Sequence, residues 1–278
     1  MSSETVLQRE DAPLDLRLSE AELDTVRENL TAFIEAQVET AGTDGAVMGL
    51  SGGIDSTTVA HLAVEALGPD SLHGLVMPSE VNDEQNMSDA ERVAEMLGID
   101  YDVIEIEPIA ASFFDEEEIE PVAQQLFDQL PDAADDRMAA GNARVRLRGV
   151  TNYFLANAEN RLVLGTGNRS EALTGYYTKY GDQAVDCNPI GGLYKQQVRQ
   201  LAAHLGVPED LVMKTPSAGM WVGQTDEGEM GVDYDTVDAI LAVHVDGGLS
   251  ASATVEALDV DREEVDRVRE LYESSAHK

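Results

Sequence analysis

Positive charge is scarce in this chain of 278 residues, which carries 18 lysines and arginines against 54 aspartates and glutamates, for a formal net charge of −36. Such a surface repels phosphate backbones, so we expect no nucleic-acid partner. Cysteine is scarcer still: Cys187 is the only one, which excludes an internal disulfide framework and any CxxC metal or redox site. Lysine occurs four times, and three of the four lie between residues 179 and 214.

Long apolar runs are absent as well. No run approaches the roughly 20 residues that a transmembrane helix needs, and the N-terminal residues lack the basic and apolar regions of a signal peptide. We therefore predict a cytoplasmic protein without a membrane partner. The acidic residues are spread along the chain, and such a surface resembles that of halophilic proteins, in which concentrated salt screens self-repulsion. A disordered acidic chain is the alternative, but a hydrophobic content of 43% with clear periodicity argues against it.

One stretch of the chain is distinctive: residues 46–58, with the sequence AVMGLSGGIDSTT. Its apolar first part, 46–50, predicts a buried strand, and a helical pattern follows the break at Ser51-Gly52-Gly53. Glycines let the backbone approach a ligand, the first N–H groups of a helix are unpaired, and the helix dipole favours negative charge. The stretch therefore predicts a phosphate site, to which Asp55 adds a carboxylate.

Asp55 distinguishes this loop from other phosphate loops. A Walker loop needs the lysine of GxxxxGK[ST], and a dinucleotide fingerprint needs GxGxxG; the stretch fits neither pattern. A carboxylate beside bound phosphates repels them unless a divalent cation lies between. We interpret the stretch as a pyrophosphate-binding loop with a Mg2+ ligand; an ordinary strand–turn–helix connection is the alternative.

The SGGxDS pattern resembles the loop of the N-type ATP pyrophosphatases, a superfamily with an adenine nucleotide alpha-hydrolase-like fold that cleaves ATP between the α- and β-phosphates. This resemblance implies that ATP is a co-substrate and that the loop holds the departing pyrophosphate. It does not identify the second substrate. The ATP-binding residues that it implies are Gly49, Leu50, Ser51, Gly52, Gly53, Ile54, Asp55 and Ser56.

Alternating strand and helix patterns predict an α/β fold: a doubly wound, mainly parallel sheet flanked by helices, with ligands at the carboxyl ends of the strands. The strands are expected at 46–50, 72–77, 101–106 and 162–164, and the main helices of this part at 19–41, 88–97, 136–159 and 194–205. We predict a single domain over 1–278, consisting of the N-terminal helix at 19–41, a nucleotide-binding core at about 45–205, a lid-like loop at about 214–231 and C-terminal helices at 233–278.

A second distinctive stretch, GTGNRSEALTGYYTKYGDQAVD at 165–186, follows the predicted strand 162–164. Because parallel strands end at one edge of a sheet, this stretch should lie beside the first loop. Asp55 and Glu171 can then share a Mg2+ that bridges triphosphate oxygens. Residues 174–192 are rich in glycine and polar side chains, which indicates a functional loop.

The second stretch narrows the resemblance to the ammonia-dependent NAD synthetases. That family amidates deamido-NAD (nicotinate adenine dinucleotide) with ammonia and ATP, through a deamido-NAD adenylate, and releases AMP and pyrophosphate. Charge on the phosphate oxygens would be stabilised by Mg2+, backbone N–H groups and lysines. The resemblance implies Asp55 and Glu171 as metal ligands, Thr166, Lys195 and Ser217 as further ATP contacts, and Arg146, Lys179, Asp186, His277 and Lys278 as deamido-NAD contacts.

Several of these residues also have a structural interpretation. Lys195 either neutralises the triphosphate, which would make it catalytic, or is a solvated helix charge. Arg146 points away from the helix face shared by Arg144 and Arg148, so one face can meet acidic neighbours and the other the dinucleotide. Tyr153 either stacks on the nicotinate ring or is a half-buried core residue.

Asp182 is the second catalytic candidate, for the ammonia step. Ammonia at neutral pH is mostly ammonium, which a carboxylate can bind and help to deprotonate. The resemblance also implies a homodimer that binds the dinucleotide between long helices, so we predict that helix 136–159 forms the interface. The sequence departs from bacterial members in the 79–88 loop and at 219–221, which leaves the ATP and lid contacts there undefined.

Two further functions stay open on the residues alone. One is another ligase of the superfamily, of the GMP-forming or tRNA-modifying type; the other is a non-catalytic ATP-binding sensor. A glutamine-dependent NAD synthetase would need an added amidohydrolase domain, for which we expect no room before residue 45. We therefore expect free ammonia, or ammonia from a separate protein, as the nitrogen source.

Overall fold

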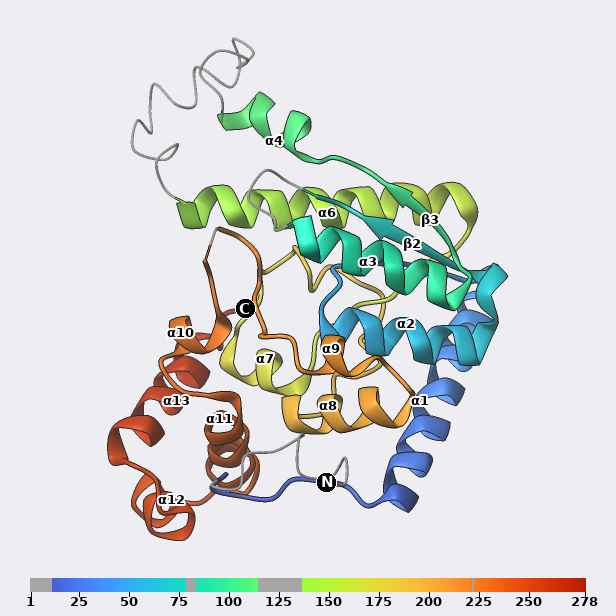
Figure 1. Ribbon diagram of the computed structural model, residues 1–278. Helices are drawn as coiled ribbons and strands as arrows, with labels where there is room; N and C mark the ends of the chain where they lie inside the picture. Colours follow the sequence, from blue (N-terminus) through green and yellow to red (C-terminus); the bar gives the residue numbers. More distant parts are fainter. Residues whose placement is uncertain (1–11, 79–83, 115–136, 222) are drawn as a thin grey trace.

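A four-stranded parallel sheet forms the centre of the computed structural model, which describes residues 12–78, 84–114, 137–221 and 223–278 (Figure 1). Its strands have the order β3-β2-β1-β4, and every neighbouring pair is parallel. The strands are β1 (Ala46–Gly49), β2 (Leu72–Val76), β3 (Asp100–Val103) and β4 (Leu162–Val163). The predicted α/β fold with a parallel sheet is confirmed, although β3 ends at Val103 rather than at 106.

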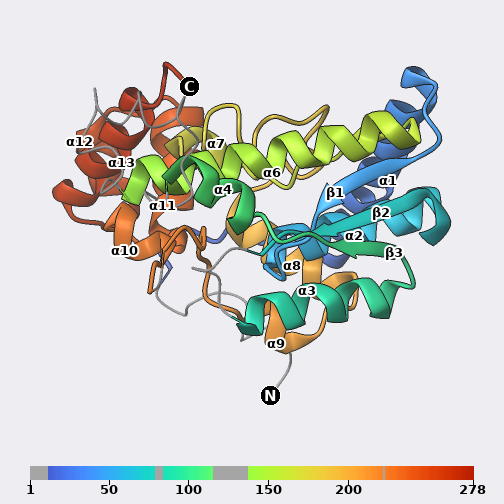
Figure 2. The same ribbon diagram turned by 90° about the horizontal axis from the view of Figure 1, so that it is seen from above.

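Successive residues of β1 pack against different layers, as the pleat of a strand requires. Ala46 and Met48 belong to a core formed with helices α1 (Glu20–Ala41), α2 (Ile54–Leu67) and α8 (Lys195–His204). Val47 belongs to a second core, on the opposite face, with Ala156 of α6 (Arg137–Glu159). Figure 2 shows α6 on one side of the strands and α3 (Glu84–Leu97), which contributes to the first core, on the other. Figure 1 shows α2 and α8 across the sheet from α6. A sheet covered on both faces explains why β1 is a continuous apolar run, whereas β3 lies at the edge of the sheet and is largely exposed.

The predicted long helices are present, and shorter helices appear between them. Ser19 and Glu22 form a capping box at the start of α1, in which the Ser19 N–H donates to Glu22 Oε2 at 2.8 Å. We did not predict α4 (Glu107–Phe114) or α7 (Arg169–Thr174), because such short helices show no clear 3.6-residue period. The remaining elements are a 3-10 turn (Pro69–Ser71), α3 (Glu84–Leu97), α4 (Glu107–Phe114), α7 (Arg169–Thr174), α9 (Glu209–Val212), α10 (Asp226–Met230), α11 (Tyr234–Ile240), a π-helical turn (Leu241–Asp246), α12 (Ala251–Leu258) and α13 (Arg262–Ser274).

The C-terminal helices α11, α12 and α13 form most of a third core, which includes Val237, Val265 and Val268 and to which Tyr194 and Met230 also contribute. This group joins the rest of the protein where α11 packs on α8 and α13 packs on α7. Figure 1 shows α7 and α8 between the C-terminal helices and α1 and α2. Part of the 79–88 loop lies outside the described residues. In the part of the chain that is described, no helix is long and apolar enough to cross a membrane.

The strand order places the point where the chain changes direction between β1 and β4. In such sheets the crevice outside the carboxyl ends of these two strands is where ligands bind. The loops that follow β1 and β4 therefore start side by side, as the sequence predicted. In the first of them Gly52 has φ +68°, a left-handed conformation that favours glycine.

Candidate active site

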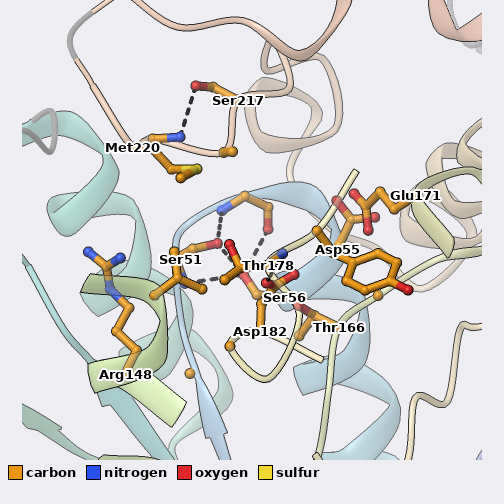
Figure 3. Close-up of a pocket in the computed structure, with 18 of the residues that line it drawn as sticks. Ser51, Asp55, Ser56, Arg148, Thr166, Glu171, Thr178, Asp182, Ser217 and Met220 are labelled. Atoms are coloured by element: carbon orange, nitrogen blue, oxygen red, sulfur yellow. Dashed lines mark hydrogen bonds between the residues drawn. The ribbon is translucent and has the colours of Figure 1, made fainter. Parts of the chain in front are cut away.

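A cavity of about 450 Å3 lies at the carboxyl ends of β1 and β4. Its walls come from the loops after both strands, from α6 and from the segment after α9. In Figure 3 the Asp55 and Glu171 side chains lie together on one side, Arg148 lies on the opposite side, and Ser217 and Met220 lie above them. Most of the sequence-predicted site residues line this cavity: Gly49, Leu50, Ser51, Gly53, Ile54, Asp55, Ser56, Thr166, Glu171, Asp182, Lys195, Ser217 and Lys278.

The loop after β1 is held by hydroxyl groups. The Ser51 N–H donates to Ser56 Oγ at 3.3 Å, and the Gly53 N–H donates to Ser51 Oγ at 3.2 Å. Ser56 Oγ in turn donates to the Gly53 carbonyl at 3.1 Å. Gly53 caps α2 without a side chain, so the helix of 14 residues directs its first N–H groups and positive dipole end toward the cavity loop. This arrangement suits a phosphate group.

One lysine joins two carboxylates at the centre of the site. Lys195 Nζ donates to Asp55 Oδ2 at 2.5 Å and to Glu171 Oε1 at 3.5 Å, although only 1% of the lysine is exposed. Asn168 connects the same acids, because its Nδ2 donates to Asp55 Oδ1 at 2.9 Å and its N–H donates to Glu171 Oε2 at 3.2 Å. Asn168 and Glu171 form the capping box that starts α7, which fixes the Glu171 carboxylate toward the cavity.

The charges in this group shift one another's pKa values. Burial would lower the pKa of Lys195, but the neighbouring carboxylates outweigh it and raise that pKa, so the ammonium stays charged. Burial, and then the like charge of Asp55, raise the pKa of Glu171. Lys195 opposes that rise without cancelling it.

The donor set fits a magnesium ion that arrives with its phosphate. Carboxylate oxygens are ligands that Mg2+ prefers, and it is usually held by one or two carboxylates together with substrate phosphates. Asp55 and Glu171 supply two such carboxylates beside the phosphate loop. Within the described residues, no group of three or more histidines, cysteines or acids is arranged to hold a metal ion by itself. The site therefore fits a metal shared with a ligand rather than a resident protein-only centre.

The segment after α9 closes one side of the cavity through side-chain bonds that the sequence did not reveal. Lys214 Nζ donates to the Gly52 carbonyl at 3.1 Å and to Asp89 Oδ2 at 2.5 Å, which joins this segment to the phosphate loop. Gln224 closes the turn, since its carbonyl accepts from Ser217 Oγ at 2.7 Å and its Oε1 accepts from the Met220 N–H at 2.7 Å. The Ser217 hydroxyl is thus already engaged within the loop.

Asp182 lies in the 174–192 loop and lines the cavity. Its Oδ1 accepts from the Thr178 N–H at 2.8 Å, and Thr178 Oγ1 donates to Asn142 Oδ1 of α6 at 2.7 Å. The carboxylate is open to the cavity, yet the protein packed around it raises its pKa through burial. A carboxylate of this kind can accept a proton more readily than a solvated one.

The residues predicted to hold deamido-NAD do not gather in the cavity. Of the six, only Lys278 lines it, where its Nζ donates to the Gly175 carbonyl at 2.5 Å. The other five form a chain of three residues and a separate pair, along α6 and at the C-terminus. Arg146 Nε donates to the Lys179 carbonyl at 3.2 Å and Lys179 Nζ to the His277 carbonyl at 2.5 Å, while the Tyr153 hydroxyl donates to Asp186 Oδ1 at 3.0 Å.

The predicted separation of Arg146 from Arg144 and Arg148 on α6 is confirmed, while the binding of the dinucleotide by Arg146 stays a prediction. Arg144 pairs with Glu107 of α4 at 2.6 Å, and Arg148 Nε donates to the Met77 carbonyl, just after β2, at 3.0 Å, whereas Arg146 contacts Lys179. Arg148 also lines the cavity, which the sequence had not assigned, and burial lowers its pKa to about 10. The spacing of Arg144 and Arg148 was the signal that placed them together.

We compared the chain with protein families, with related sequences and with solved structures. The family model described as NAD synthase matches residues 26–278. The NH(3)-dependent NAD(+) synthetase of Halobacterium salinarum is 63% identical over 267 residues, which cover 96% of this chain and 95% of that protein. Among solved structures, NMN synthetase from Francisella tularensis has a TM-score of 0.78 with 35% identity, covering 94% of this chain and 96% of that one.

NH3-dependent NAD synthetase from Campylobacter jejuni has a TM-score of 0.71 with 29% identity, covering 91% of this chain and 95% of that one. The family match extends over most of the chain and includes both loops that form the cavity. The chain therefore belongs to the NAD synthase family and is a carbon–nitrogen ligase that amidates deamido-NAD with ammonia at the expense of ATP, which confirms the function predicted from the sequence.

Proposed function

We propose that the two halves of this reaction use different walls of the cavity. In the first half, an oxygen of the nicotinate carboxylate attacks the α-phosphorus of ATP, the bond to the β-phosphate oxygen breaks, and pyrophosphate leaves. In the second half, ammonia attacks the acyl carbon of the adenylate, the bond to the AMP oxygen breaks, and one proton is lost. The observation that carries this proposal is the contact of Lys195 with both Asp55 and Glu171 beside the phosphate loop.

We assign adenylation to the loop after β1 together with the charged side chains of Asp55, Glu171 and Lys195. The unpaired N–H groups at the start of α2 and the hydroxyls of Ser51 and Ser56 would bind the phosphates, and Thr166 would contribute from another wall. Ser217 would contribute once its hydroxyl exchanges the Gln224 carbonyl for a phosphate oxygen. Lys195 would neutralise charge that develops on the departing pyrophosphate. Its raised pKa keeps the ammonium charged at neutral pH.

Asp55 and Glu171 would hold Mg2+ together with oxygens of the bound phosphates. Bound there, Mg2+ supplies charge neutralisation for the leaving pyrophosphate. Lys195 supports this role, since its ammonium already balances the two carboxylates that would otherwise repel each other and the nucleotide. The same balance explains how two acids can lie in one largely enclosed site.

We assign the proton transfer of the amidation step to Asp182. Its carboxylate would bind ammonium and take up the proton that must leave before nitrogen can attack. Two observations support the role: the side chain lines the same cavity as the phosphate loop, and burial raises its pKa toward the range in which it can accept a proton.

Deamido-NAD would extend from the cavity along α6, and a second protomer would complete its site. Arg146, Lys179 and His277 form one contact chain beside that helix. The outer surface of the same region exposes large apolar side chains: Val150 is 67% exposed, Phe154 76% and Tyr180 73%. Val150 and Phe154 lie four residues apart and so share one helix face, which supports a homodimer through α6.

The finer assignments about the whole protein are also proposals. The excess of 36 negative charges supports a halophilic protein that does not bind nucleic acid. The cytoplasmic location, the absence of a membrane partner and the single domain over 1–278 stay predictions. Sedimentation and activity measured from low to molar salt would test the halophilic assignment.

Exchange of labelled pyrophosphate into ATP tests the proposed function. Because adenylation is reversible, the enzyme should catalyse exchange that requires deamido-NAD and Mg2+ and does not require ammonia. Lys195→Met should abolish exchange, whereas Arg92→Met, which removes a cation from an exposed ion pair, should retain it. Exchange that proceeds without deamido-NAD, or that survives in Lys195→Met, contradicts the proposal.

A further inference from the structure

Asp238 is a fully buried carboxylate that lies next to the active site but does not line its cavity. It belongs to α11 in the C-terminal helices, is 0% exposed, and is not among the described residues that line the cavity. Its Oδ1 accepts from Ser170 Oγ at 2.5 Å, and its Oδ2 accepts from the Gln196 N–H at 3.0 Å. One carboxylate thus binds two separate helices, α7 and α8.

A chain of hydrogen bonds leads from Asp238 to the charged side chains of the active site. Ser170 Oγ, which donates to Asp238, accepts from the Lys195 N–H at 2.9 Å. Ser170 is the neighbour of Glu171, and the Lys195 side chain reaches Asp55 and Glu171. The Asp238–Ser170 pair therefore holds the backbone of Lys195 and lies next to Glu171, whose carboxylate is 3.5 Å from the Lys195 ammonium.

Helix chemistry explains why a carboxylate occupies this place. The first N–H groups of an α-helix have no partners within the helix, and its N-terminus carries partial positive charge. In α8 the first two of these donors, on Lys195 and Gln196, are satisfied by Ser170 and Asp238 rather than by a capping side chain of the preceding residues. Arg199 of α8 and Asp235 of α11 are the charged groups that act on Asp238. Removing the carboxylate would leave buried donors unpaired.

We propose that Asp238 is a positioning residue for adenylation, whose carboxylate holds the starts of α7 and α8 together so that Lys195 reaches both Glu171 and Asp55. It acts through Ser170 and the backbone and touches no substrate. The inference rests on the roles proposed above for Lys195 and Glu171. Asp238 thereby connects the C-terminal helices, which form most of the third core, to the adenylation site at the end of the sheet.

The test compares substitutions that remove the carboxylate in steps. Asp238→Leu removes both acceptors, while Asp238→Asn keeps one oxygen that can accept from Gln196. Ser170→Ala breaks the same chain without changing buried charge, and it carries the test if Asp238→Leu does not fold. Asp235→Asn is the matched control: it removes a carboxylate that is also buried, one turn earlier on α11, and that lies 3.6 Å from Arg199.

We expect kcat to fall about 10- to 100-fold in Asp238→Leu and less in Asp238→Asn. A loss of this size is usual when a residue that orients a metal-binding side chain is removed. The KM for deamido-NAD should change less than about twofold, and the control should keep its kcat. The affinity for magnesium pyrophosphate, measured by calorimetry, should fall with kcat. Deuterium exchange of a peptide spanning 193–199 should become faster. Because both residues act through one chain, Asp238→Asn combined with Ser170→Ala should lose less than the product of the single losses.

A folded Asp238→Leu enzyme with unchanged kcat and pyrophosphate affinity would overturn the proposal, as would an equal loss in Asp235→Asn. Lys195→Met separates this failure from failure of the proposed function. If Lys195→Met is inactive while Asp238→Leu is fully active, only the positioning role is wrong. If Lys195→Met is active, the proposed role of Lys195 is wrong as well.

Discussion

Lys195 and Asp55 lie 140 residues apart in the chain, yet Lys195 Nζ is 2.5 Å from Asp55 Oδ2. Asp55 lies in the first turn of α2, directly after β1, and Lys195 starts α8, beyond the loop that follows β4. The strand order brings these points together, because β1 and β4 are neighbours and end at one edge. The contact joins the phosphate loop to a cation that the loop itself lacks.

Replacing Lys195 by methionine should lower kcat for NAD formation by about 100- to 1000-fold, the loss typical of removing one group that stabilises developing charge. The substitution also leaves two neighbouring carboxylates without their cation. Steady-state assays of AMP release would measure the effect, with Arg92→Met as the control for loss of one positive charge. Activity within threefold of the parent would contradict the role.

Glu171→Gln should weaken the binding of magnesium ATP by about 10- to 100-fold, because an amide is a poorer magnesium ligand than a carboxylate. The parent should also bind magnesium ATP less tightly as pH falls, since burial and Asp55 raise the pKa of Glu171 and protonation removes the ligand. The variant should lose most of that pH dependence. Calorimetric titrations at several pH values would show both effects; an identical pH dependence in the two proteins would refute the assignment.

Asp182→Asn should raise the KM for ammonia at least tenfold and leave the KM for ATP unchanged. The carboxylate can accept a proton only when ionised, and burial raises its pKa, so the rate of amidation in the parent should fall as pH drops through that raised pKa. The variant should follow only the supply of free ammonia, which rises with pH. If its ammonia KM and pH profile match those of the parent, Asp182 has no part in the step.

Replacing Val150 and Phe154 together by serine should convert a dimer to monomers, because these exposed apolar side chains would form the centre of the interface. Light scattering in molar salt would give the mass of each species. The control replaces Met96 and Met213, which are 44% and 50% exposed elsewhere on the surface, and should leave the mass unchanged. A parent protein that is already monomeric in active conditions would rule out the proposed dimer.

Asp238 should make the folded protein less stable as pH rises from about 4 to 7. Burial raises its pKa to about 7, so between these values the folded state holds a proton that the unfolded chain has released. Between about pH 4 and pH 7 this group lowers the free energy of unfolding by about 1.4 kcal/mol per pH unit, and the slope disappears outside that range. Comparing Asp238→Asn with the parent by chemical unfolding between pH 5 and 8 isolates it. Parallel curves for the two proteins would show that Asp238 does not titrate in this range.

Local patterns predicted the strands, the long helices and the phosphate loop, because each pattern can be recognised within a window of about 11 to 18 consecutive residues. The 3.6-residue period also separated Arg146 from Arg144 and Arg148 correctly. The partners of Lys214 and Ser170 were not visible, since Asp89 and Asp238 lie on ordinary helices 125 and 68 residues away in the chain. The deamido-NAD residues did not converge either, which follows if part of their site comes from a second protomer.

Rapid-quench measurement of pyrophosphate in ammonia-free buffer tests most directly the claim that Lys195 serves adenylation and Asp182 serves amidation. The enzyme is mixed with ATP, Mg2+ and deamido-NAD, and the amplitude of the first turnover is recorded. We predict a full burst of pyrophosphate in the parent and in Asp182→Asn, and no burst in Lys195→Met. A burst that is lost in Asp182→Asn, or one that persists in Lys195→Met, would contradict the account.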